Sequence, residues 1–171
     1  MIASEAVPFA KTGGLGDVAG ALPAALARQG CSVTLIVPRY RAVAGGTTIT
    51  RFPVTVGGRT LDVGFVEHPL AGAARAVLVD CPELFDRPEL YGVGNADYPD
   101  NAFRFGAFTR AALEFAARLD LHPDIVHAHD WQSGLAPVYI RTLYANHPEL
   151  ARAGLVFTIH NLAYQGLFPP H

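Results

Sequence analysis

Apolar and polar residues follow two periodicities along the chain, one typical of helices and one typical of strands. Residues 17–29 carry apolar side chains at helical spacing, with Asp17 as the expected N-cap and Gly30 as the stop. Residues 32–37 are rich in β-branched residues, and residues 1–5 have the composition of the end of a strand whose beginning is missing. Together these segments predict a βαβ unit.

The middle of the chain changes character. Residues 49–56, 61–67 and 76–79 are β-formers separated by glycine-containing pairs, which predicts two or three short strands in a hairpin-rich excursion. Residues 82–99 are rich in Pro, Gly, Asn and Asp. A long irregular loop of this kind is uncommon in a minimal domain unless it serves a binding surface, so we expect it to face a substrate.

The last part of the chain returns to alternating elements. Residues 100–119 predict a long helix capped at Asp100, whose phenylalanines form a core stripe. A strand over 123–130, a helix over 133–144 and a strand over 155–159 follow. This alternation predicts an α/β fold with a Rossmann-like, doubly wound and mostly parallel sheet.

Composition narrows the class of protein. The chain has 171 residues, half of them hydrophobic, and a formal net charge of −2. Without a basic run it is not expected to bind nucleic acid, and its apolar runs are too short to cross a membrane. Cys31 and Cys81 are isolated, so we expect buried free thiols and a cytoplasmic protein.

One residue stands out by its type. Twelve of the thirteen basic residues are arginine, and the single lysine, Lys11, lies in a loop with Gly13, Gly14 and Gly16 directly before the first predicted helix. Glycine-rich turns that enter a helix bind anions through backbone N–H groups, and a lysine adds a mobile positive charge. The loop is therefore a candidate phosphate site.

Polar motifs follow several of the predicted strands. The Lys11 loop, the segment that begins at His127 and the pair His160-Asn161 all come at strand ends. In doubly wound sheets, ligands bind beyond the carboxyl ends of the strands, so we expect these motifs to converge. His127, His129 and His160 could in principle share a metal, but supporting carboxylates are few and we expect no metal.

A dinucleotide site is the main alternative at the glycine loop. Gly14, Gly16 and Ala19 fit the G-x-G-x-x-G/A pattern, yet the next strand ends without an acidic residue. Arg39 and Arg41 stand there instead, so such a site would bind NADP, and the chain would be an oxidoreductase domain. A titration with NADPH tests this alternative.

Ordered blocks along the whole chain resemble the bacterial glycogen synthases and plant starch synthases that use ADP-glucose. The blocks are Ala3-Ser4-Glu5, Pro8-Phe9-Ala10-Lys11-Thr12-Gly13-Gly14-Leu15, Asp17-Val18 with Gly20-Ala21-Leu22-Pro23, Tyr98 with Asp100-Asn101, His127-Ala128-His129-Asp130-Trp131, and Phe157-Thr158-Ile159-His160-Asn161-Leu162-Ala163-Tyr164-Gln165-Gly166. This extended match is far more specific than a glycine loop alone.

The resemblance implies a retaining glucosyltransferase of the GT-B architecture, with two Rossmann-like domains around a cleft. Such an enzyme transfers glucose from ADP-glucose to the nonreducing end of an α-1,4-glucan such as glycogen or a maltooligosaccharide. The resemblance implies neither a metal nor another cofactor. Residues 1–171 would be the amino-terminal domain, incomplete, with the carboxyl-terminal nucleotide-binding domain absent, so we expect this chain alone to be inactive.

The resemblance also assigns roles to residues. Lys11, with backbone groups of Gly13 and Gly14, would lie against the donor's phosphates and sugar, and His160 would contact the transferred glucose. The residues expected along the sugar and acceptor side are Asp17, Tyr98, Asn101, Asp130 and Asn161. Lys11, Asp130 and His160 are the expected catalytic residues, because bond cleavage leaves negative charge on the diphosphate and positive charge on the sugar.

Two consequences of incompleteness remain open. A stand-alone glucan-binding module could use the acceptor face without catalysis, and its binding would not depend on Lys11. An incomplete sheet would also expose apolar edges, which favours self-association.

Overall fold

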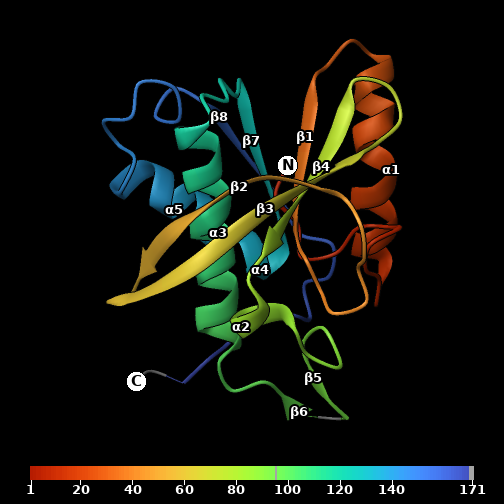
Figure 1. Cartoon of the computed structure of the whole chain (residues 1–171), viewed down its shortest axis with the longest axis vertical. Coiled ribbons are helices and arrows are strands. Elements are labelled where there is room, and N and C mark those ends of the chain that lie inside the picture. The colour runs from red at the N-terminus through yellow and green to blue at the C-terminus, as the bar shows by residue number, and fades with distance from the viewer. Residues whose placement is uncertain (95, 170–171) are drawn as a thin grey trace.

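The computed structural model describes residues 1–94 and 96–169 (Figure 1). Its helices and strands alternate in the first and last thirds of the chain and frame an antiparallel excursion between them. In chain order the elements are α1 (Gly14–Arg28), β1 (Val33–Pro38), β2 (Thr47–Val56), β3 (Arg59–Pro69), β4 (Ala74–Asp80), α2 (Pro82–Phe85), β5 (Gly92–Val93), β6 (Ala96–Asp97), α3 (Asn101–Arg118), β7 (Ile125–His129), α4 (Asp130–Ser133), α5 (Leu135–Thr142) and β8 (Gly154–Thr158).

The first residues of the chain form the centre of the sheet. Ile2 pairs in parallel with Ile36 of β1 on one side and with Ala128 of β7 on the other. The Ile2 N–H donates to the His127 carbonyl at 2.8 Å, and the Ala3 N–H donates to the Ile36 carbonyl at 3.1 Å. The expected strand end at residues 1–5 is therefore confirmed, and it joins two groups of strands.

The sheet is parallel at its centre and antiparallel on one flank. β1 pairs in parallel with β4, and β7 pairs in parallel with β8. β3 runs antiparallel to both β2 and β4, so residues 47–80 form the predicted hairpin-rich excursion. The α/β fold with parallel sheet elements is confirmed, and its antiparallel strands are those with the alternating pattern.

Helices cover both faces of this sheet. Along β1, Leu35 and Val37 belong to the cluster that includes Leu15 and other apolar residues of α1, whereas Ile36 belongs to the cluster with the α3 phenylalanines. Neighbouring residues of a strand point to opposite faces, so α1 and α3 lie on opposite sides. Figure 1 shows β1 and β4 between these two helices. The prediction that the α3 phenylalanines are core residues is confirmed.

Several predicted boundaries differ from the structure. The first helix begins at Gly14 rather than Asp17, and the Asp17 carboxylate pairs with Lys11 instead of capping the helix. Asp100 does hold the N-cap position of α3, but its carboxylate bonds to Arg87. The expected helix 133–144 is divided at Gly134 into α4 and α5. Gly30, at φ 88°, ends α1 as predicted.

Segment 82–99 is more ordered than its composition indicates. It contains α2 and the short hairpin β5–β6. The Arg104 side chain, fully buried in α3, donates to the carbonyls of Leu84 and Leu90 and to Oδ1 of Asn101. A buried guanidinium thus supplies the donors that irregular backbone would otherwise lack.

The two cysteines differ in their exposure to solvent. Cys81 is buried, and burial raises the pKa of its thiol. Cys31 is exposed, so the expectation of a buried thiol there was wrong: it follows the stop of α1, before β1 enters the sheet.

Gly20 permits the closest approach of α1 to the segment before it. A Cβ atom at Gly20 would lie 2.6 Å from the Val7 carbonyl oxygen. The Val7 carbonyl is part of the backbone and cannot move aside as a flexible side chain would. We therefore expect Gly20→Ala to lower the free energy of unfolding by about 1–3 kcal/mol, measured by urea denaturation. Gly154→Ala is the matched control, since its Cβ would meet its nearest neighbour at 3.5 Å. Equal stability of the two variants would contradict this packing argument.

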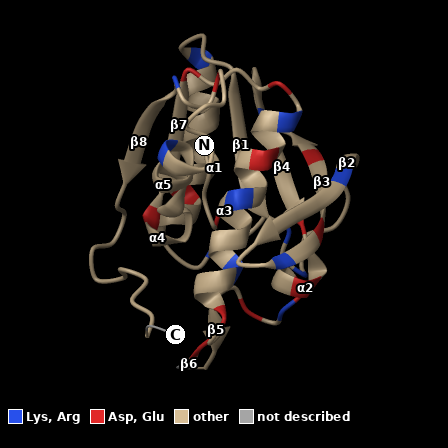
Figure 2. Cartoon of the chain, turned by 90° about the vertical axis from the view of Figure 1, so that its left-hand side faces the viewer, with Lys and Arg blue, Asp and Glu red and all other residues tan. Residues whose placement is uncertain are grey.

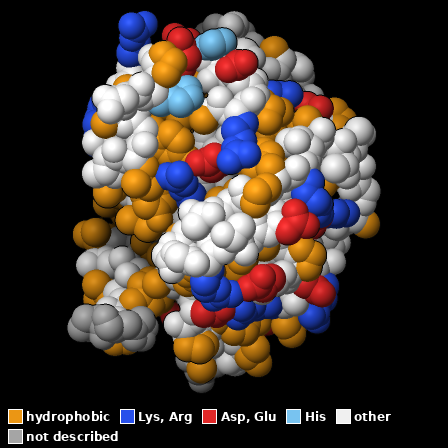
Figure 3. Space-filling model, turned by 60° about the vertical axis from the view of Figure 1, so that its left-hand side comes forward, with side chains coloured by type: hydrophobic (Ala, Val, Ile, Leu, Met, Phe, Trp, Pro, Cys, Tyr) orange, Lys and Arg blue, Asp and Glu red, His pale blue; other side chains and the backbone are white. Residues whose placement is uncertain are grey.

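Charged and apolar side chains are distributed unevenly on the surface. Acidic and basic positions are interspersed over the elements in view in Figure 2. Exposed large apolar side chains concentrate in α5 and from β8 to Leu167, on the side where Figure 3 shows hydrophobic groups gathered. Within residues 1–94 and 96–169, the helices are too short or too polar to cross a membrane.

Candidate active site

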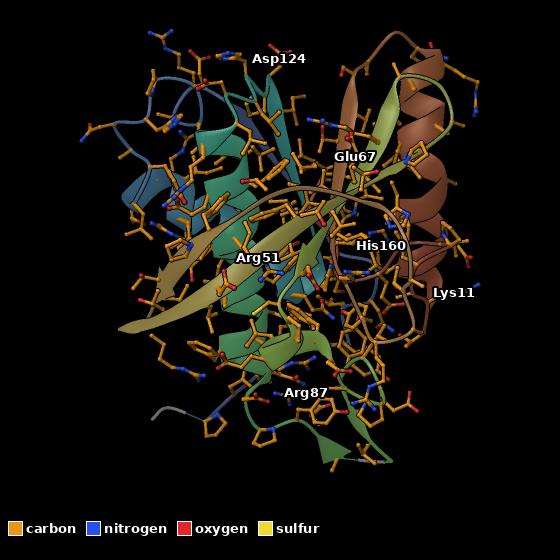
Figure 4. All side chains as sticks on the ribbon, viewed as in Figure 1. Lys11, Arg51, Glu67, Arg87, Asp124 and His160 are labelled. Carbon is orange, nitrogen blue, oxygen red and sulfur yellow. The ribbon has the colours of Figure 1, made fainter. Side chains whose placement is uncertain are left out.

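The candidate site lies where adjacent parallel strands end. The Lys11 loop follows the central strand at residues 1–3, Asp130 follows β7, and His160 follows β8. These strands run in the same direction, so the three motifs share one rim of the sheet. Figure 4 shows Lys11 at the outer edge of the molecule and His160 further inside. The Lys11 loop and the pair His160-Asn161 therefore approach the rim from opposite sides of β7.

Asp130 and His160 are joined directly. The His160 backbone N–H donates to Oδ1 of Asp130 at 2.7 Å. Asp130 adopts φ 56°, a left-handed conformation that is uncommon for residues other than glycine and that often marks functional sites. This conformation turns the carboxylate from the end of β7 toward the residue that follows β8.

Histidines line the same rim behind His160. His129 Nδ1 and His160 Nε2 lie 3.0 Å apart in a hydrogen bond, and His127 Nε2 lies 2.7 Å from the Thr158 hydroxyl. His129 is fully buried, and burial, with smaller contributions from His127 and His160, lowers its pKa to about 3. His129 is therefore neutral near pH 7, and it orients the imidazole of His160.

The histidine cluster does not resemble a metal centre. Nδ1 of His129 and Nε2 of His160 are committed to each other, so neither presents a free lone pair outward. A search of residues 1–94 and 96–169 finds no group of three or more His, Cys, Asp or Glu side chains arranged to hold a metal ion. The expectation of a metal-free site stays a prediction.

Lys11 presents its ammonium at the surface. The Nζ atom lies 2.8 Å from Oδ2 of Asp17, and about half of each side chain is exposed, 49% and 58%. An exposed ion pair of this kind contributes little to stability, so an incoming anion can take over the ammonium at small cost. Gly16 makes room for the Lys11 side chain, because a Cβ there would lie 3.0 Å from the lysine Cγ.

Glu5 is a residue of the site for which the sequence predicted no role. Its side chain is buried, and Oε2 accepts hydrogen bonds from the backbone N–H groups of Thr12 and Gly13. The N–H of Gly13 is therefore engaged with Glu5 rather than directed at a ligand. Gly14 opens α1, whose first N–H groups lack intrahelical acceptors and remain the backbone donors for an anion. The only sequence signal was an acidic residue directly after a buried strand.

Tyr98 and Asn101 belong to the framework of segment 82–99. Asn101 is 1% exposed, its amide donates to the Tyr91 carbonyl at 2.7 Å, and its oxygen accepts from Arg104 at 2.6 Å. The Tyr98 ring lies beneath the guanidinium groups of Arg87 and Arg104. Arg104, which the sequence analysis did not single out, could have been noticed as a lone charge on the apolar stripe of a helix.

A surface pocket adjoins the Lys11 loop. It has a volume of about 510 Å³ and is lined by Thr12 and by residues 88–94, 96 and 97. The long loop, which the sequence predicted to face a substrate, thus lines a hollow beside the candidate phosphate site. Asp17 lies in the first turn of α1 and does not line this pocket.

Asn161 follows β8, and Trp131 lies in α4, which follows β7. Asn161 is exposed, and its Oδ1 accepts from the Ala163 N–H at 3.0 Å, which shapes the turn after β8. Trp131 packs edge-on against Phe105 of the core, with ring centroids 5.3 Å apart. The expectation that Trp131 packs beneath the site agrees with this contact.

The arginines that an NADP site would need have other partners. Arg39 lies 3.6 Å from the Asp80 carboxylate, and Arg41 lies 2.6 Å from that of Asp86. Both arginines thus pair with carboxylates of the chain itself, although the Arg41–Asp86 pair is as exposed as the Lys11–Asp17 pair.

The fold is a Rossmann-like α/β domain with a glycine loop at one rim of its sheet. The chain belongs to the starch synthase catalytic domain family, whose model matches residues 1–171. This confirms the resemblance seen in the ordered sequence blocks, and it replaces the NADP-dependent alternative.

Curated relatives and a solved structure agree with this family. Glycogen synthase 2 of Geobacter sulfurreducens is 47% identical over 174 residues, covering 99% of this chain and 36% of the relative. Glycogen synthase of Anaeromyxobacter dehalogenans strain 2CP-C is 48% identical over 172 residues, covering 98% and 35%. The catalytic domain of starch synthase IV from Arabidopsis thaliana, bound to ADP and acarbose, matches with a TM-score of 0.84 and 33% identity, over 96% of this chain and 34% of that one. The chain thus spans about a third of the length of these relatives.

Proposed function

We propose that this chain is the part of a glycogen or starch synthase that holds the donor's phosphates and the transferred glucose. The complete enzyme would transfer glucose, with retention, from ADP-glucose to the nonreducing end of an α-1,4-glucan. The observation that carries the proposal is the family match over the whole chain, together with three strand-end motifs on one rim. The solved relative bound to ADP and acarbose supports a nucleotide and a glucan-like ligand.

Lys11 and the start of α1 would stabilise the departing diphosphate. The half-exposed ammonium exchanges Asp17 for a phosphate, and N–H groups from Gly14 onward point along the helix axis toward the anion. Charge-assisted bonds of this kind contribute about 1.5–3 kcal/mol each. Gly13 would contribute through its backbone N–H, which donates to Glu5 and so helps to hold the loop in place.

Asp130 and His160 would face the sugar. Asp130 fixes the His160 backbone, and neutral His129 fixes the His160 ring, so the imidazole is preorganised to contact glucose hydroxyls as positive charge develops at the anomeric carbon. Tyr98, Asn101 and the pocket beside them would lie toward the acceptor, with Asn101 acting through its support of Tyr91. Asn161 would border the same space.

The decisive experiment supplies the second domain. Fusion of this chain to the remaining part of the Geobacter sulfurreducens relative is expected to give transfer of labelled glucose from ADP-glucose to glycogen, whereas the chain alone is expected to give none. UDP-glucose and NADPH serve as competing ligands in the same assay. Binding of maltooligosaccharides without transfer in the fusion would favour the glucan-binding alternative.

Lys11→Gln tests the phosphate contact. In the fusion protein, we expect Lys11→Gln to lower kcat/KM for ADP-glucose at least about tenfold, because the substitution removes one charged hydrogen bond. The free energy of unfolding should change by less than about 1 kcal/mol, since the Lys11–Asp17 pair is exposed. Arg28→Gln, at the exposed far end of α1, is the matched control. Unchanged kcat/KM in Lys11→Gln would defeat the proposed contact.

A further inference from the structure

Glu5 lies at the centre of a hydrogen-bond network between two segments that are far apart in sequence. It is 4% exposed and follows the central strand of the sheet. Oε2 accepts from the N–H groups of Thr12 and Gly13, while Oε1 accepts from the Thr12 hydroxyl at 2.7 Å and from the Tyr91 hydroxyl at 2.6 Å. The two carboxylate oxygens therefore bind donors from two separate segments, the glycine loop and segment 82–99.

The direction of these bonds can be assigned. The Tyr91 hydroxyl donates to Glu5, so the Ser4 hydroxyl, 2.7 Å away, donates to Tyr91. Burial raises the pKa of Tyr91, which keeps its proton available for donation. The Ser4 carbonyl in turn accepts from the hydroxyl of Tyr40 at 2.8 Å. Through Tyr91 and Ser4, the Glu5 carboxylate is thus linked to the buried Tyr40 as well as to the Lys11 loop.

The network continues through Tyr91 into segment 82–99. The Tyr91 carbonyl accepts from Asn101, and Asn101 accepts from Arg104, which also binds the carbonyls of Leu84 and Leu90. A continuous set of hydrogen bonds therefore runs from the Lys11 loop to the segment that lines the adjoining pocket.

We propose that Glu5 is a positioning residue, which holds the Lys11 loop in its anion-binding shape and couples it to segment 82–99. This inference rests on the proposed function for its catalytic consequence. Its structural part stands independently, because the bonds join residues of this chain.

The side-chain chemistry distinguishes this role from simple packing. Glu5→Ala removes both acceptors and leaves the Thr12 and Gly13 N–H groups without a partner. Glu5→Gln keeps one oxygen for those N–H groups, while its amide can donate to the hydroxyls of Thr12 and Tyr91, which are able to accept. The glutamine variant should therefore rescue the loop in part. Tyr91→Phe removes the bond between Glu5 and segment 82–99, together with the acceptor of the Ser4 hydroxyl, and leaves the bonds from Thr12 and Gly13 to Glu5 in place.

The test combines amide hydrogen exchange with titration of inorganic pyrophosphate, both followed by NMR on this chain. In Glu5→Ala we expect exchange at Thr12 and Gly13 to accelerate at least about tenfold and pyrophosphate affinity to fall by a similar factor, with Glu5→Gln intermediate. In Tyr91→Phe we expect faster exchange in residues 88–94 while Thr12 and Gly13 stay protected. Glu83→Ala, an exposed glutamate paired with Arg59, is the control.

Each outcome decides a separate point. Unchanged exchange at Thr12 and Gly13 in Glu5→Ala overturns the proposal. Accelerated exchange with unchanged pyrophosphate affinity overturns the positioning role for the anion. If the unsubstituted chain does not bind pyrophosphate, the donor contact of the proposed function fails, and the exchange data still decide whether Glu5 holds the loop. If Glu5→Ala does not fold, Thr12→Ala with Tyr91→Phe removes the hydroxyl donors, and unchanged exchange there counts against the coupling.

Discussion

Arg104→Met is expected to lower the free energy of unfolding by about 3–5 kcal/mol, measured from urea denaturation followed by circular dichroism. The substitution leaves the Leu84 and Leu90 carbonyls and the Asn101 oxygen buried without their donor. Replacing a buried ion by an apolar side chain can be neutral when its partners are also replaced, but here the acceptors remain. The loss of these bonds therefore outweighs the gain from removing a buried charge.

Two further variants sharpen this expectation. Arg104→Lys keeps the charge but cannot reach the same acceptors as a planar fork, so it should fall between the methionine variant and the unsubstituted chain. Arg152→Ala, at an exposed arginine, should stay within about 0.5 kcal/mol of it. A loss below about 1 kcal/mol in Arg104→Met would mean that water satisfies the carbonyls of segment 82–99.

Acid is expected to destabilise the domain through His129. The pKa of His129 is about 3 in the folded state, mainly because of burial, and about 6.5 is expected after unfolding. Between these values the unfolded chain binds a proton that the folded chain does not, so stability falls as the pH falls through this window. The slope should approach about 1.4 kcal/mol per pH unit, and the total loss should be roughly 5 kcal/mol.

The measurement must be made at a pH where the titration of His129 contributes more to the stability change than that of neighbouring groups. Burial lowers the pKa of the Met1 amine to about 6, and burial also lowers the pKa of His127, so both contribute in the same direction. We therefore expect the clearest signal between about pH 5.5 and pH 5, where the folded amine has largely regained its proton and most carboxylates stay ionised, while the contribution of His127 is common to the proteins compared. In this window His129→Asn should flatten the dependence of unfolding free energy on pH, whereas His122→Gln at an exposed histidine should not. A parallel slope in His129→Asn would assign the effect elsewhere.

Periodicity predicted the elements that depend on local pattern. The helices at α1 and α3, the strands around the central sheet and the hairpin flank all follow from spacing of apolar residues. It could not place the start of α1, because the Asp17 carboxylate is drawn to Lys11 by charge rather than to the helix end. Nor could it predict order in segment 82–99, since that order comes from hydrogen bonds to the Arg104 side chain in the helix that follows, which apolar spacing does not report.

The site was predictable in outline for a topological reason. Motifs at the ends of adjacent parallel strands must share a rim, which brought the Lys11 loop, Asp130 and His160 to one side of the sheet. The support beneath them was not predictable. Glu5 and Tyr91 meet although they are remote in sequence, and Arg104 binds carbonyls of the irregular segment before its own helix; their residue types alone carry no signal of those partners.

The place of Ile2 between β1 and β7 has a consequence for synthesis on the ribosome. Residues 1–3 can bind only β1 until the backbone of His127 and His129 emerges, so the middle of the sheet closes late. Such a delay leaves the other edge of residues 1–3 free for pairing with other nascent chains. Chaperone dependence during translation should therefore end abruptly once β7 has left the exit tunnel.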